Sequence, residues 1–496
     1  MTQVAPVEAT DGPALKRDFT FASSFAFGFA FISPIVALYG IFGIALSTAG
    51  PSFWWGFLIV FGGQLLVAMV FAMLVSRWPI EGSIYQWSAR LGGRAIGWFA
   101  GWTYMWTLLI AMATVALAAA GFLANVIGME APTGIEKAGI AIIILLFGTA
   151  VNLAGRRVLK IFMAASIVAE IIGSLGLGTW LLLFHQNNSI SVLFDGGKGL
   201  AAGTDYLSMG GPFLVAMVFI GFSFVGFESA GAIAEEVTEP RKNLPRAILF
   251  ALIFIAIVVM YTSLAIILAV PDLDAVRSGD VLDPVNATLT SQLGAGIAKP
   301  VEVLFVIGFL ASFLALQTAA SRMIWSFARD KALPGSRWLS KLSRVQRQPT
   351  GPILVTMVFG AALFLLSNVV ADVYTLMLNF TSGGFFLSFL FPLIGFLVIK
   401  LRGQWKDGPF TLGRGTTVVA VIAVVWAVFE FLNIAWPRPF FEAEFLNWSI
   451  WIAMGVLGGL GAVIYLALRK NIPVVTGLDF VMSEDVETNK GTVSSS

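Results

Sequence analysis

Residues Gly221 to Glu236 read GFSFVGFESAGAIAEE and contain the clearest clue to the fold. They lie inside a long apolar run, yet they include three glycines and the acidic Glu228. A helix that only crosses a bilayer uses neither, because glycine weakens helices and a carboxylate at membrane depth is costly. The stretch therefore predicts a membrane helix that is broken where it faces protein or a water-filled cavity.

The composition of the whole chain is that of a helical membrane protein. Its 496 residues are 58% hydrophobic and only 12% charged, about half the charged fraction of an ordinary soluble chain. With no cysteine and a single histidine in a polar loop, neither a thiolate metal site nor histidine-based catalysis is expected, and no cofactor is predicted. The net charge of +2 gives no indication of nucleic acid binding, and the polar N-terminus does not resemble a cleavable signal.

Apolar blocks of about 20 residues or more predict an all-α polytopic protein with twelve transmembrane helices. Their approximate ranges are 20–48, 54–76, 95–127, 135–153, 158–184, 209–235, 245–270, 301–327, 352–371, 373–399, 416–436 and 448–468. With this topology, 25 of the 30 lysines and arginines fall on the side that holds both termini. Because cytoplasmic loops are enriched in these residues, the tails 1–19 and 469–496 are expected in the cytoplasm and the protein in the cytoplasmic membrane.

Span one carries a second predicted break. It reads FASSFAFGFAFISPIVALYGIFGIALSTAG, and Pro34 lacks an amide hydrogen and disfavours helix at Ser33. Two broken helices five spans apart predict one cavity with a break on each side, as in transporters built from inverted repeats. Close helix packing remains the alternative explanation for each break taken alone.

Span six and its exit, FIGFSFVGFESAGAIAEEVTEPRKNLPRAI, resemble the amino acid–polyamine–organocation superfamily. RWPIEGSIYQWSARLGG after span two and SRMIWSFARDKALP at the end of span eight are also similar to that family. The resemblance covers roughly residues 20–400 and is closest to the branch that carries amino acids, 4-aminobutyrate and choline. It implies a leucine-transporter-type core of two inverted five-helix repeats, about 20–184 and 209–400, with helices 1 and 6 unwound at mid-membrane. Helices 11 and 12, at 416–468, follow this core.

The resemblance implies that the unwound parts of spans one and six touch the substrate. These residues are Ser33, Pro34, Ile35, Val36, Ala37, Phe222, Ser223, Phe224, Val225, Gly226 and Phe227. Unwinding frees backbone groups, and phenylalanine faces attract ammonium groups, although packing is the simpler role for any single ring. Span one lacks the family's glycine-rich turn, which weakens the case for a tightly held α-carboxylate and favours an amine, or an amino acid whose amine is far from its carboxylate. The amides of Val36 and Ala37 remain an alternative carboxylate site.

Two carboxylates at membrane depth are candidates for coupling or gating. Glu228 directly follows the break in span six, where the resemblance implies a role in proton response or gating. Glu170 lies about 18 Å along span five, where some proton-coupled relatives carry a lysine in place of a sodium ion. A carboxyl group removed from water favours its protonated form, so Glu170 is expected to carry a proton or to balance a cationic substrate. The structural alternative for Glu228 is a hydrogen bond to a neighbouring helix. For Glu170 it is a local bond with Ser166 or Ser174, or a bond to a facing helix.

Other polar and aromatic residues have weaker indications. Arg322 and Arg329 are expected to anchor cytoplasmic loops by pairing with Glu235, Glu236 or Glu239. Three aromatic residues of span three are candidates for the cavity wall, although packing is the commoner role. They are Trp102, Tyr104 and Trp106.

These patterns predict a secondary active transporter for an amino acid or a small amine such as 4-aminobutyrate, working by alternating access. Span eight has no adjacent Ser/Thr pair for sodium, so proton coupling or exchange is favoured. A choline or polyamine transporter of the same fold is the alternative. A channel or membrane-embedded enzyme is remote, because the sequence has no His/Cys cluster, phosphate loop or repeated pore ring. The expected partners are a small-molecule substrate, with or without protons, and the lipid bilayer; the oligomeric state stays open.

Overall fold

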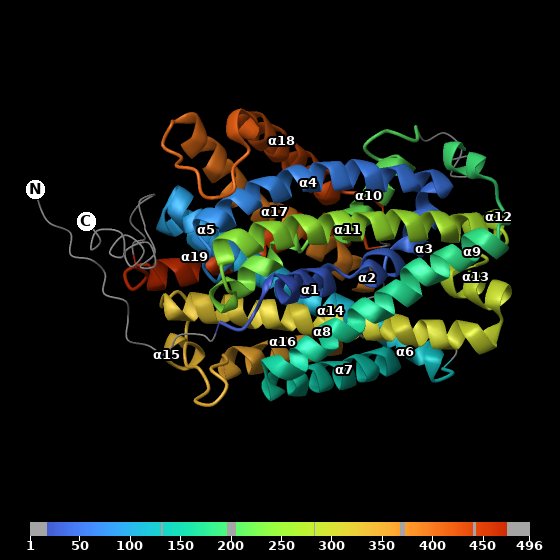
Figure 1. Ribbon diagram of the computed structural model, residues 1–496, viewed down its shortest axis with the longest axis horizontal. Helices are drawn as coiled ribbons and strands as arrows, with labels where there is room; N and C mark the ends of the chain where they lie inside the picture. Colours follow the sequence, from blue (N-terminus) through green and yellow to red (C-terminus); the bar gives the residue numbers. More distant parts are fainter. Residues whose placement is uncertain are drawn as a thin grey trace, which may run out of the picture.

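The computed structural model describes residues 17–129, 132–195, 205–281, 283–367, 373–439 and 443–473. These residues form a bundle of long helices that run side by side along its longest axis (Figure 1). Among them, the only β structure is a parallel bridge between Phe19 and Val237. Helices α5 and α15 lie at one end of the bundle, and α3, α12 and α13 lie at the other.

The chain is helical through almost all of its apolar blocks. The helices of the first half are α1 (Phe21–Ile32), α2 (Pro34–Tyr39), α3 (Phe42–Ala49), η1 (Pro51–Phe53), α4 (Trp54–Arg77), α5 (Ser83–Gly92), α6 (Arg94–Val126), α7 (Gly134–Ala154), α8 (Arg156–Glu170), η2 (Ile171–Gly176), α9 (Leu177–Phe184) and η3 (Ile190–Phe194). Those of the second half are α10 (Pro212–Ser223), η4 (Phe227–Glu236), α11 (Pro240–Ala269), α12 (Leu273–Ser278), α13 (Pro284–Leu293), α14 (Ala295–Arg329), α15 (Ser336–Leu339), α16 (Thr350–Leu366), α17 (Val373–Leu401), η5 (Gly413–Gly415), α18 (Thr416–Ala435), η6 (Glu444–Trp448) and α19 (Ser449–Leu468).

Eleven helical runs in the described part of the chain are long and apolar enough to cross a membrane. The helix α16 coincides with the expected ninth span but has only 17 residues, and residues 368–371 of that span lie outside the described ranges. Spans seven and eight begin at Pro240 and Ala295, about five residues earlier than predicted. Both helices continue through a proline, Pro245 in α11 and Pro300 in α14.

The packing of the long helices places spans one and six in the middle of the bundle. The helix α1 packs against α11, α14 and η4, and α10 packs against α3, α4 and α17. The long helices α6 and α14 lie against each other, and α17 packs on α6 as well. By contrast, only Ile450 and Gly461 of α19 are buried, so α19 lies on the outside of the bundle.

Candidate functional site

The first break separates α1 from α2 at a single residue. Ser33 has φ 51° and ψ 115°, outside the helical region, and Pro34 begins α2 in the first position, where its missing amide costs nothing. The Ser33 hydroxyl caps α2 by accepting a hydrogen bond from the Val36 amide at 3.2 Å. The helix of span one is therefore interrupted at Ser33, directly before the proline.

Glu170, the last residue of α8 in span five, forms hydrogen bonds with the residues of this break. The Ser33 hydroxyl donates to its Oε1, the Ile35 amide donates to its Oε2 at 3.0 Å, and the Ser174 hydroxyl lies 3.4 Å from Oε2. The carboxyl group is only 2% exposed. Span five continues as the π-helical turn η2, a local widening that is frequent at functional sites. Thus the first candidate coupling residue is bonded directly to the first candidate substrate segment.

The second break separates α10 from η4. Gly226 has φ 99°, a left-handed conformation, and a Cβ placed there would lie 2.4 Å from the ring of Phe31. Only glycine fits this turn without strain. One residue of α10, Ser223, joins the two breaks by donating its hydroxyl hydrogen to the Ala37 carbonyl at 2.5 Å.

Glu228 lies in the first turn of η4 and is 0% exposed. Its Oε1 accepts a hydrogen bond from the Tyr104 hydroxyl at 2.9 Å, whereas its Oε2 has no hydrogen-bond partner in the described part of the chain. Glu228 therefore connects span six to span three, and it is less completely bonded than Glu170.

A small cavity lies between the two breaks. Its volume is about 20 Å³, which is room for about one water molecule. Its walls come from spans one, three, six, eight and ten, and all of them except one serine are apolar. The lining residues are Phe31, Ile32, Val36, Ala111, Val115, Phe222, Val225, Ser312, Leu316 and Phe385. The Ser312 hydroxyl donates to the Phe31 carbonyl at 2.7 Å, so even this serine is engaged.

The predicted site residues have different places in the structure. Val36, Phe222 and Val225 line the cavity, while Ser33, Ile35, Ala37 and Ser223 make the bonds that hold the breaks. Pro34 is buried at the start of α2. The rings of Phe224 and Phe227 lie outside the cavity wall: Phe224 packs against Phe57 and Phe61, and Phe227 packs against Phe71 and Phe389.

Several wall residues were not predicted from the sequence. Ala111, Val115, Leu316 and Phe385 come from spans three, eight and ten. An apolar residue that faces a central cavity has the same appearance in sequence as one that faces lipid, so no signal identified them. Ser312 also lines the cavity, where its hydroxyl bonds a backbone carbonyl.

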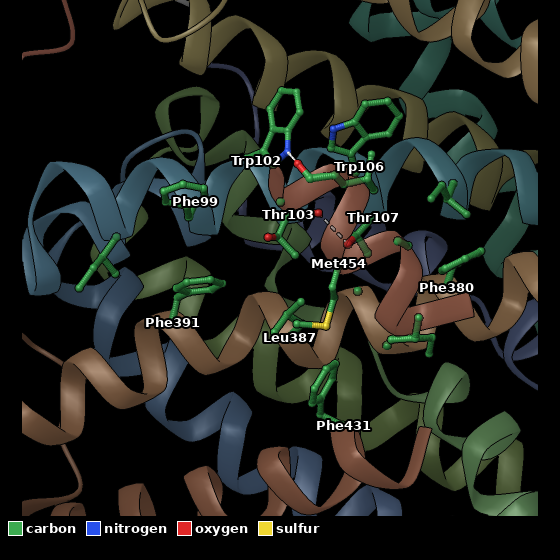
Figure 2. Close-up of a pocket in the computed structure, with 18 of the residues that line it drawn as sticks. Phe99, Trp102, Thr103, Trp106, Thr107, Phe380, Leu387, Phe391, Phe431 and Met454 are labelled. Atoms are coloured by element: carbon green, nitrogen blue, oxygen red, sulfur yellow. Dashed lines mark hydrogen bonds between the residues drawn. The ribbon is translucent and has the colours of Figure 1, made fainter. Parts of the chain in front are cut away.

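A larger hollow of about 360 Å³ lies elsewhere, between α6, α17 and α19 (Figure 2). Trp102 and Trp106 of α6 line it, and Trp102 donates its indole hydrogen to the Leu457 carbonyl at 2.9 Å. No residue of either break reaches this hollow, and its wall includes the outer helix α19. The two tryptophans therefore face the periphery of the bundle, whereas Tyr104, from the same helix, faces Glu228.

A protein-family model and several known proteins match most of the chain. A family model described as amino acid permease matches residues 19–460, which include both breaks. The chain is 26% identical to an uncharacterized amino-acid permease of Schizosaccharomyces pombe, over 88% of this chain and 81% of that relative. It is 24% identical to the branched-chain amino acid permease BcaP of Bacillus subtilis, over 84% of this chain and 88% of BcaP. It is also 23% identical to the thiamine transporter thi9 of Schizosaccharomyces pombe, over 90% and 82% of the two chains.

Proposed function

The chain belongs to the amino acid permease family, and on that premise we propose that it is a secondary active transporter for an amino acid or a small amine. The observation that carries the proposal is the cavity between the breaks of spans one and six. At about 20 Å³ it has room for about one water molecule, so the bundle must rearrange for a substrate to enter. Opening to each side in turn is alternating access.

We place the transporter in the cytoplasmic membrane with twelve spans and both termini in the cytoplasm. In this topology α16 is the ninth span, and the inverted repeats extend over about 20–184 and 209–400. The distribution of lysine and arginine supports the orientation, and the matched breaks in the first helix of each repeat support the symmetry. Helices 11 and 12 then pack outside the ten-helix core.

The hydrogen bonds at the first break bear on the substrate. The amides that a substrate carboxylate would need already have acceptors: Glu170 for Ile35, the Ser33 hydroxyl for Val36, and the Ser33 carbonyl for Ala37. A carboxylate would have to displace Glu170, whereas an ammonium group could approach it. With the apolar cavity walls, this favours a small amine, or an amino acid such as 4-aminobutyrate whose amine is far from its carboxylate. Choline or a polyamine is the alternative.

We propose Glu170 and Glu228 as the coupling or gating residues. Both are buried, and neither carboxyl group forms an ion pair with a lysine or arginine of the described residues. A buried carboxylate without a counter-charge is stable only when it is protonated or when it faces a cation. Each is therefore suited to hold a proton in this conformation and to exchange it when the cavity opens, which favours proton symport or exchange.

Counterflow in proteoliposomes without an ion gradient tests the proposal. The vesicles are loaded separately with leucine, 4-aminobutyrate, choline and putrescine, and entry of the same labelled compound is followed. Transient accumulation above equilibrium with one of them is expected and identifies a carrier, because a channel gives no such overshoot. A folded preparation that shows no counterflow with any of the four would contradict the substrate assignment, and chemical conversion of a compound would indicate an enzyme instead.

A further inference from the structure

A second group of charged side chains, some fully and some partly buried, lies around the loop before α5 and the C-terminal part of α14. The helix α5 is at the same end of the bundle as α15 (Figure 1). Here the segment before α1 is joined to the exit of η4. The amides of Asp18 and Phe19 both donate to the Glu236 carbonyl at 2.9 Å, and the Thr238 amide donates to the Phe19 carbonyl at 2.8 Å. The distribution of basic residues assigns this end to the cytoplasm. An opening toward the cytoplasm must therefore separate these contacts between spans one and six.

We call the charged side chains at this place the inner charge cluster. Its members are Glu81, Arg156, Glu235, Glu236, Arg322 and Arg329. The carboxylate of Glu236 lies 2.5 Å from Nε of Arg156 and 3.1 Å from Nε of Arg322. Nη1 of Arg329 lies 3.0 Å from both carboxylate oxygens of Glu235. These five side chains are therefore paired with one another.

Glu81 is the member of the cluster without a partner for its side chain. It lies in the loop between α4 and α5 and is 0% exposed. Its backbone is fixed, because its amide donates to Oε1 of Glu235 at 3.2 Å and its carbonyl accepts from the Ser326 hydroxyl at 3.0 Å. Neither oxygen of its carboxyl group has a hydrogen-bond partner in the described ranges. A carboxylate buried in this way is costly unless it carries a proton.

Of the charges around Glu81, two add to the effect of burial on its pKa and two oppose it. Burial raises the pKa of Glu81 well above its ordinary value, and the negative charges of Glu235 and Glu236 raise it further. Arg322 and Arg329, which are paired with Glu236 and Glu235, lower it by a smaller amount. These four groups, from η4 and α14, are the charges that face Glu81.

We propose that Glu81 is a proton-binding residue of the transport cycle, protonated while the inner charge cluster is closed and deprotonated when the cluster opens to the cytoplasm. The proton passes from the carboxyl group of Glu81 to water, and no other group is transferred. The inference rests on the proposed function, because it needs a bundle that opens and closes. It adds a proton site at the end of the pathway, separate from Glu170 and Glu228 at the breaks.

The sign of the pH dependence follows from the geometry. The pKa of Glu81 is raised in the closed cluster and returns toward its ordinary value in contact with water, so the closed form binds more protons than the open form. Raising the pH from the ordinary carboxyl range toward the raised pKa therefore removes stability from the closed form. With one proton involved, the ratio of open to closed forms rises by at most about tenfold per pH unit.

Labelling of a single cysteine tests the proposal without any substrate. The chain has no cysteine, so Ser229→Cys introduces a unique thiol. Ser229 lies in η4 between Gly226 and the inner charge cluster, is 0% exposed, and its hydroxyl has no hydrogen-bond partner among the described residues. The full-length protein in lipid nanodiscs is treated with a water-soluble maleimide between about pH 5.5 and pH 8. Val345→Cys, at a position that is 94% exposed, corrects for the pH dependence of the thiol itself.

We expect the corrected labelling of Ser229→Cys to rise by about tenfold over this range, and to stay low and flat when Glu81→Gln is added. Glu81→Met, neutral and of similar length, is a second variant in case the amide disturbs folding. Glu235→Gln is the matched control: it breaks the ion pair with Arg329 and should raise labelling at every pH. The proposal is overturned if the neutral variants keep the pH response, if they raise labelling as Glu235→Gln does, or if the parent shows no response.

The outcome is separable from that of the counterflow experiment. If no compound shows counterflow but labelling follows the expected pattern, the substrate assignment fails and the role of Glu81 stands. If counterflow succeeds and labelling does not depend on Glu81, the proton site fails while the transporter stands.

Discussion

The two breaks that enclose the cavity are held by different means. The break in span one is closed by a side chain from another helix, since Glu170 accepts hydrogen bonds from Ser33 and from the Ile35 amide. The break in span six is held by its own backbone, because Gly226 adopts a left-handed conformation against the ring of Phe31. The carboxyl group beside it, Glu228, is bonded through only one oxygen.

This difference indicates what can move each break. The hydrogen bonds between a carboxyl group and the start of a helix can break when the carboxyl group changes its charge or its partner. The first break is therefore sensitive to protons and to cationic substrates. A glycine turn packed against a ring depends on shape and not on charge. We therefore expect substitutions at the second break to act through sterics and substitutions at the first to act through titration.

The largest effect is expected for Gly226→Leu. Its Cβ would lie 2.4 Å from the Phe31 ring, in a backbone conformation that costs a residue with a side chain about 1–2 kcal/mol before any clash is counted. Counterflow should fall below about one hundredth of the wild-type rate, since overpacking adds about 1–3 kcal/mol more. Initial rates in proteoliposomes measure this.

Gly62→Leu is the matched control for this substitution. Gly62 lies in α4 and is exposed on the outer surface, and a Cβ placed there would have no neighbouring atom within 4 Å. Both variants should purify as folded, monodisperse protein, and the control should keep the wild-type rate. A Gly226→Leu variant with wild-type counterflow would show that the second break is not part of the pathway.

The second effect is expected at Glu170. Glu170→Ala removes the acceptor for Ser33 and Ile35 and leaves a buried amide unbonded, a loss of about 2 kcal/mol or about thirtyfold in rate. Glu170→Gln keeps one acceptor oxygen but cannot titrate, so it should retain most of the rate and lose its dependence on pH. Rates measured at several pH values distinguish the two variants, and a Gln variant with an unchanged pH profile would remove Glu170 as the proton carrier.

The sequence predicted the positions of both breaks because they depend on local chemistry. A proline disfavours helix at Ser33, and a glycine permits positive φ at position 226, wherever the helices pack. The pairing of Arg322 and Arg329 with glutamates at the exit of span six was also predicted, and the structure confirms it. The starts of spans seven and eight were predicted too late, because the helices tolerate their prolines.

The partners of the buried carboxyl groups could not be predicted in this way. The bond between Ser33 and Glu170 joins residues 137 positions apart and depends on how span five is rotated about its axis. Similarly, Glu81 lies in the short loop between α4 and α5, and it is buried only once η4 and α14 pack over it. Apolar wall residues such as Val115 cannot be distinguished in the sequence from apolar residues that face lipid.

A smaller effect is expected for Tyr104→Phe, which removes the side-chain hydrogen bond to Glu228 and keeps the ring that packs on Phe385. Loss of this bond at a buried carboxyl group costs about 1 kcal/mol or about fivefold in rate. Tyr206→Phe is the matched control, since its hydroxyl bonds the Ala49 carbonyl away from any buried carboxyl group. Equal rates in the two variants would mean that Glu228 does not depend on Tyr104.

The smallest effect is expected for Ser223→Ala, which cuts the bond from the second break to the Ala37 carbonyl of the first. A neutral hydrogen bond contributes about 0.5–1.5 kcal/mol, so we expect roughly a threefold loss of rate. The double variant of Ser223→Ala with Glu170→Gln tests whether the two breaks are coupled. If the two breaks move as one unit, the combined effect departs from the sum of the single effects by more than about 0.5 kcal/mol. Additive effects would instead show that a break governed by titration and a break governed by shape open independently, and Ser223 would then be a packing contact alone.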